Sequence, residues 1–147
     1  MKNLIILFLI LIGCGNSENG KKLNGDEQRD LLEEVLTLSL DANQLTQSPK
    51  GETVFELSAE VEEEIVKKFE RSIDLGESLN PKFLKFIKGD LPQQFNNNLI
   101  LGMKKYLKGL KSKDINLQIE GNKLTMNWGQ YWEKNKDSIL NKMYPEN

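Results

Sequence analysis

A chain of 147 residues is long enough for one domain with a sizeable core, and its 38% hydrophobic and 29% charged residues are typical of a folded protein. It contains one cysteine and no histidine, which excludes an internal disulfide and removes the usual ligands of structural zinc and the histidine bases of acyl transfer. A net charge of −2 and only two arginines argue against a nucleic-acid partner. We therefore expect neither a metal site nor a cofactor.

The first residues are organised like a secretory signal. Met1-Lys2-Asn3 is a short basic start, residues 4–12 are an unbroken apolar run, and Gly13-Cys14 precedes an abruptly polar sequence. The apolar run is too short to cross a bilayer as a permanent helix. The sequence therefore predicts export.

Leu11-Ile12-Gly13-Cys14 resembles the lipobox of bacterial lipoproteins, with an aliphatic residue, a small residue and the cysteine at their usual places. The resemblance covers residues 1–14 and implies cleavage before Cys14, a diacylglyceryl thioether on its sulfur and acylation of the new amino group. Several acyl chains anchor durably, whereas one holds only marginally. Gly15 is not the aspartate that retains many enterobacterial lipoproteins at the inner membrane, which favours the outer membrane in a Gram-negative host. The alternative is an ordinary signal peptide or an uncleaved anchor in which Cys14 is incidental.

These boundaries divide the chain into three parts. Residues 1–13 are the expected signal peptide and residues 14–25 the lipidated N-terminus with a tether rich in Gly and Asn. Such a composition is typical of a flexible linker. Residues 26–147 are expected to form a single globular domain.

The domain opens with four expected helices. The first begins at Asp26, the second follows a capping Ser58, the third has Asn80 as cap and Pro81 as first residue, and the fourth begins at Asp90-Leu91-Pro92. Residues 53–57 suit either a short strand or the approach to the second helix. The fourth helix is the most amphipathic, with one apolar side formed by Phe95, Leu99, Met103, Tyr106, Leu107 and Leu110.

A β-hairpin is expected over residues 115–128. Ile115, Leu117 and Ile119 alternate with polar residues, as do later apolar residues, and Gly121-Asn122 between the two runs suits a tight turn. A last helix is expected over residues 130–143. The predicted fold class is thus α+β and mainly α: four helices, a hairpin and a C-terminal helix.

Catalytic signals in the sequence are weak. No nucleotide-binding, hydrolase or kinase motif occurs, and Glu62-Glu63-Glu64 stands at a helix start, where acidic residues offset the helix dipole. Asp90, Asp114 and Glu120 are conceivable acids. An enzyme would need two such carboxylates together in a cleft.

Two surfaces are candidates for binding. Residues 15–79 hold 7 basic and 16 acidic side chains, whereas residues 80–147 hold 12 and 6, so the halves carry opposite charge. The simplest interpretation is that packed helices neutralise each other; the functional one is a basic face for an anionic partner. The candidate contact residues are the lysines and aromatics Lys104, Lys105, Lys108, Lys111, Trp128, Tyr131 and Trp132.

From the sequence we therefore expect a lipid-anchored bacterial lipoprotein without enzymatic activity, which binds a protein of the cell envelope. An inhibitor, immunity or exclusion role belongs to the same class. The alternative is a carboxylate-dependent envelope enzyme acting on glycan or lipid. A solute carrier would instead require an enclosed apolar cavity.

Overall fold

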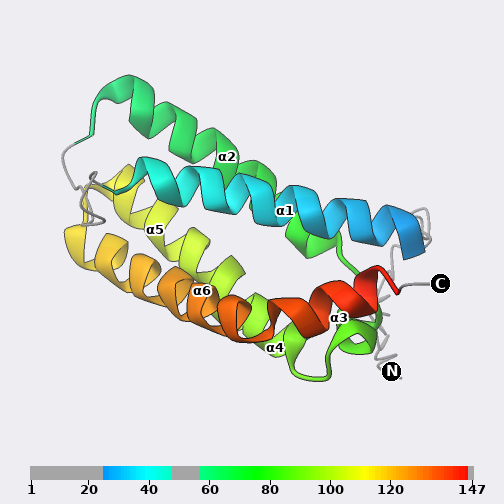
Figure 1. The fold of residues 1–147 in the computed structure, drawn as a ribbon. Coiled ribbons are helices and arrows are strands. Elements are labelled where there is room, and N and C mark those ends of the chain that lie inside the picture. The colour runs from blue at the N-terminus through cyan, green and yellow to red at the C-terminus, as the bar shows by residue number, and fades with distance from the viewer. Residues whose placement is uncertain (1–24, 48–56, 146–147) are drawn as a thin grey trace, which may run out of the picture.

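The computed structural model describes residues 25–47 and 57–145, and in this part of the chain helices are joined by short connections, without a β-strand (Figure 1). Residues 1–24, which include Cys14, lie outside it, as do residues 53–56 of the segment that suited a short strand. The described elements are α1 (Gly25–Leu45), α2 (Ala59–Ser78), α3 (Pro81–Ile87), α4 (Leu91–Gln94), the π-helical segment η1 (Phe95–Ile100), α5 (Leu101–Ser112) and α6 (Ile115–Met143).

The long helices form two antiparallel pairs. α1 packs against α2 and α5 against α6, and α2 also contacts α5, so the two pairs share one core (Figure 1). A buried hydroxyl links the first pair, because Ser72 Oγ donates to the carbonyl oxygen of Val35 at 3.0 Å. The largest fully buried apolar side chains come from every long helix and include Leu32, Ile65, Phe69, Phe95, Leu99, Met103, Tyr106 and Ile139.

The expectation of a β-hairpin over residues 115–128 is wrong, and with it the α+β fold class. These residues belong to α6, a helix of 29 residues that begins at a capping Asp114, whose carboxylate accepts from the backbone N–H of Asn116 and Leu117. Apolar residues that would have filled the inner hairpin face are exposed: Ile115 by 53% and Met126 by 56%.

The side of α6 that faces the core is made of small and polar residues. Gln118, Gly121, Thr125 and Trp128 are buried, and their spacing of three, four and three residues is that of a helix face. Gly121 lies where α5 and α6 approach closely: a Cβ there would come within 2.4 Å of the backbone nitrogen of Tyr106. The glycine taken for a turn residue is therefore a close-packing residue inside a helix.

The four expected helix starts are confirmed to within one residue, since α1 begins at Gly25 and not at Asp26. Ser58 caps α2 and Asn80 caps α3, each side chain accepting from a backbone N–H of the first turn. The helix after Asp90 runs to Ser112, but it is interrupted by η1. The wider turn of a π-helix brings Phe95, Leu99 and Ile100 to the inside together, and Phe95 and Ile100 lie directly over Gly76 of α2.

Candidate binding groove between α1 and α6

The lysines of α5 lie along the seams between helices and are largely paired with glutamates. Lys104 pairs with Glu77 of α2, and Lys105 Nζ lies 2.6 Å from an oxygen of Glu120 on α6. Lys111 Nζ lies 2.5 Å from an oxygen of Glu70 on α2.

Opposite charges in the two halves of the sequence thus meet between α2 and α5. The pairing of Lys113, just after α5, with Glu62 at 2.7 Å extends the pattern. This favours the interpretation that the packed helices neutralise each other. Of the four lysines considered as contacts, Lys108 makes no ion pair within the described part of the chain, which leaves it the most available of that face.

The aromatic residues of α6 form one cluster with η1. The buried Trp128 meets Phe95 edge to face, with ring centroids 5.7 Å apart, and lies 5.7 Å from Tyr131 and 6.1 Å from Trp132. Edge-to-face packing of this kind stabilises the core beyond the area that it buries. Trp128 is therefore part of the core.

Tyr131 and Trp132 have different surroundings. The hydroxyl of Tyr131 donates to Asp90 at 2.9 Å, and partial burial together with this carboxylate raises the pKa of Tyr131. Tyr131 thereby holds α6 to the start of α4. Trp132, half-buried, lines a surface groove on the side of α1.

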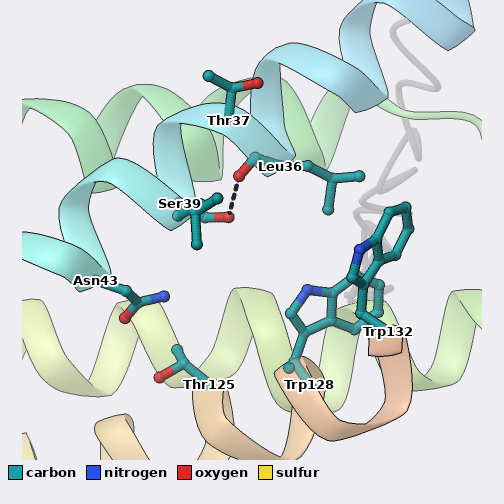
Figure 2. A pocket seen from close by; sticks show the side chains of 9 residues that line it. Leu36, Thr37, Ser39, Asn43, Thr125, Trp128 and Trp132 are labelled. Atoms are coloured by element: carbon teal, nitrogen blue, oxygen red, sulfur yellow. Dashed lines mark hydrogen bonds between the residues drawn. The ribbon is translucent and has the colours of Figure 1, made fainter. Parts of the chain in front are cut away.

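The groove runs between α1 and α6 and has a volume of about 290 Å³. Figure 2 shows Trp128 and Trp132 rising from α6 toward α1, with Leu36 opposite them and Asn43 and Thr125 toward the other end. Leu40, exposed by 58%, also lines it. The full lining is Leu36, Thr37, Ser39, Leu40, Asn43, Thr125, Trp128, Gly129 and Trp132.

The lining carries no charged side chain, in a chain of which 29% of residues are charged. Two of its three hydroxyls donate to their own helices: Ser39 Oγ donates to the Leu36 carbonyl and Thr125 Oγ1 to the Asn122 carbonyl, both at 2.9 Å. Their oxygen atoms therefore remain available as hydrogen-bond acceptors for a group bound in the groove. The indole nitrogen of Trp128 faces the groove on the side of Ser39 and Asn43 (Figure 2). Such a site favours an uncharged, mainly apolar group with a few hydrogen-bonding atoms.

Comparison with protein-family models, with curated proteins and with solved structures found no match. The groove is therefore interpreted from its own geometry.

The three conceivable catalytic acids, and Glu62 of the acidic run, each serve a different local interaction. Glu62 binds Lys113, Asp90 accepts from Tyr131, Asp114 caps α6 and Glu120 binds Lys105. Within the described residues, no group of three or more acidic or thiol side chains is placed to hold a metal ion.

The half of the groove that α1 supplies was missed by sequence reasoning. In the sequence alone, Leu36 and Leu40 do not differ from the other leucines of the first helix. A signal was present, because the buried positions Leu32, Val35 and Ser39 define the inner face of α1 and leave Leu40 just outside it. An exposed leucine beside a core face is an available contact residue, but only the fold shows that Trp132 lies across from it.

Proposed function

We propose that this chain is a bacterial lipoprotein, anchored through acyl chains on Cys14, that binds an envelope protein through the groove between α1 and α6 and catalyses no reaction. The observation that carries the proposal is the juxtaposition of Leu36 and Leu40 of α1 with Trp128 and Trp132 of α6 around an uncharged depression. Tryptophan is enriched among the residues that dominate binding energy at protein interfaces.

The dimensions of the groove indicate what it receives. Its volume of about 290 Å³ is near the lower limit of pockets for small molecules, roughly 300–1,000 Å³. It therefore suits one or two apolar anchor side chains of a partner, with neighbouring surface forming the rim. The amide of Asn43 and the indole N–H of Trp128 supply hydrogen bonds to carbonyl oxygens of the same partner segment.

Two further observations support this proposal over the alternative of an envelope enzyme. The acids that an enzyme would need are each engaged in a separate structural interaction, as described above. The groove itself contains no titratable side chain to transfer a proton. Among the described residues no helix has the length and apolar character to cross a membrane, and the proposed attachment is through lipid at Cys14.

The binding surface is tested by placing one positive charge inside the groove and the same charge outside it. Leu40→Lys puts the charge in the groove, and Met126→Lys puts it at a position of similar exposure on α6 that does not line the groove. Because a desolvated charge opposes apolar contacts, we expect Leu40→Lys to reduce cross-linked capture of the partner from host membranes about tenfold or more. Met126→Lys should capture as the unmodified protein does.

Equal capture by the two variants would contradict the groove as binding site. The anchor is tested separately by labelling with a fatty-acid analogue. Label should appear in the unmodified protein and be lost in Cys14→Ser, and equal labelling of the two would contradict lipidation at Cys14.

A further inference from the structure

One end of the bundle brings together the start of α1, the end of α6 and the short helix α3 (Figure 1). Arg29 of α1 ties this end together, because its Nη1 donates to the carbonyl oxygen of Met143 at 2.8 Å and its guanidinium lies 5.5 Å from the ring centroid of Tyr144. A shallow depression of about 330 Å³ lies among the three elements, lined by residues that include Gly25 and Phe86.

The outer face of α3 is both aromatic and basic. Phe86 is exposed by 66%, more than any other large hydrophobic side chain among the described residues. Lys82 and Lys85 are exposed beside it on the same helix face, and the Nζ of Lys142 from α6 lies 4.9 Å from the ring centroid of Phe86. An exposed aromatic ring with one ammonium group over it and two exposed lysines on the same short helix is an arrangement that suits the boundary between lipid headgroups and acyl chains.

These lysines differ from most of those of α5. Within the described part of the chain, Lys82, Lys85 and Lys142 have no ion pair with a carboxylate, whereas three of the four α5 lysines pair with glutamates of neighbouring helices. Asp26, the acidic side chain that lines the same depression, is paired with Arg29. The positive charge around Phe86 is thus left for an anionic surface outside the protein.

The attachment point of the chain lies at the same end. Gly25 lines the depression together with Phe86 and Lys142, and eleven peptide steps (25 − 14) separate it from Cys14. Eleven residues span at most about 40 Å, and usually less. α6, at 29 residues, is about 43 Å long. The end with α3 is therefore the one closest along the chain to Cys14, and the turn between α5 and α6 lies about one helix length farther away.

From these juxtapositions we propose that the outer face of α3 docks on the anionic lipid surface of the membrane that holds the anchor. The ring of Phe86 enters the headgroup boundary, and Lys82, Lys85 and Lys142 lie against lipid phosphates. The inference rests on the lipid anchor of the proposed function but not on the groove.

This docking determines how far the groove lies from the membrane surface. Thr125 and Trp132 of the groove precede the last residue of α6, Met143, by 18 and 11 residues, which corresponds to roughly 27 and 17 Å along the helix. With α3 on the membrane, the groove is held clear of the lipid surface and open to a partner from the aqueous side.

The lipidated protein, reconstituted in vesicles, allows a direct test. Cys14 is the only cysteine of the chain and its sulfur is blocked by the lipid, so Phe86→Cys and Met126→Cys each provide one free thiol for a nitroxide label. In vesicles rich in phosphatidylglycerol, we expect the label at position 86 to be relaxed more by apolar oxygen than by a water-soluble nickel chelate. The label at position 126 should show the reverse.

A second pair of variants separates local from overall charge. The first variant carries Lys82→Gln and Lys85→Gln together with the label at position 86. We expect the ratio of oxygen accessibility to nickel accessibility at this label to fall about twofold or more, because two of the lysines proposed to bind lipid phosphate have been removed. Lys67→Gln/Lys123→Gln, two exposed lysines on α2 and α6, changes the net charge equally and should leave the ratio unchanged.

The outcomes distinguish the two proposals. The protein could float with the vesicles while the labels at positions 86 and 126 are equally accessible to nickel. That result would refute docking through α3 and leave the anchor intact. A protein that carries no acyl chain and does not float would overturn the anchor, and the docking inference with it.

Discussion

Substitution of Gly121 by alanine is predicted to destabilise the fold by forcing apart two helices that are in backbone contact. A Cβ at position 121 would lie 2.4 Å from the Tyr106 nitrogen, 2.7 Å from the Gly102 carbonyl oxygen and 2.8 Å from the Tyr106 Cα. All three are backbone atoms of α5 and cannot move aside as a flexible side chain would. Ordinary contact begins near 3.4 Å, so α5 and α6 would have to separate locally by about 1 Å.

The magnitude follows from two opposing effects. Replacing glycine by alanine inside a helix contributes about 1 kcal/mol of stability through helix propensity. Forcing an extra methyl group into a closely packed interface costs about 1–3 kcal/mol. Because the clash is with backbone, the cost should be at the upper end of that range, and Gly121→Ala should lose about 1–2 kcal/mol overall.

Gly129→Ala is the matched control, since position 129 lies on the same helix with nothing within 4 Å of its Cβ. It should gain about 0.5–1 kcal/mol. The two variants should therefore differ in thermal midpoint by roughly 10 °C, at about 4 °C per kcal/mol for a domain of this size. Circular dichroism melting of both variants beside the unmodified protein measures this difference. A Gly121→Ala variant as stable as Gly129→Ala would refute the close approach of α5 and α6.

Two further predictions concern buried hydroxyls. Ser72→Ala removes the 3.0 Å hydrogen bond to the Val35 carbonyl and should lower the free energy of unfolding in urea by about 1–2 kcal/mol; an unchanged midpoint would contradict the link between α1 and α2. Burial, together with the charge of Glu62, raises the pKa of Tyr106 from 10 to about 12, so the folded state favours the protonated phenol and stability should fall as the pH rises from 10 toward 12. Because the Tyr106 hydroxyl has no hydrogen-bond partner in the described structure, Tyr106→Phe should keep or raise stability at neutral pH and flatten this alkaline loss; an equally steep loss would show that another group causes it.

Much of the helical architecture was predictable from local chemistry. Ser58, Asn80 and Pro81 mark helix starts because a capping oxygen or a missing N–H satisfies the first turn, whatever the helix packs against. The buried side of the fourth expected helix was also correct, since Phe95, Leu99 and Met103 repeat at a spacing that only one helix face accommodates.

The segment 115–128 shows where local patterns fail. Its apolar residues alternate as in a strand, yet Ile115, Ile119 and Met126 are exposed and the buried positions include Gly121 and Thr125. Where two helices approach to backbone contact, small side chains are selected for the inside, so apolar periodicity no longer marks the buried face. No window of this sequence contains that information, because the constraint comes from Gly102 and Tyr106 on another helix.

The candidate sites also include some features that follow from local sequence and others that depend on the tertiary structure. The sequence by itself determined the lipobox resemblance at Cys14, since a signal read by processing enzymes must be local, and it singled out Trp128 and Trp132 as candidate contact residues. Only the tertiary structure decided that Leu40, more than 80 residues away, lies across the groove from them, and that α3 lies beside the start of α1. Helix propensity and capping act over a few residues, whereas a groove and a docking face are made by the packing of helices that are distant in sequence.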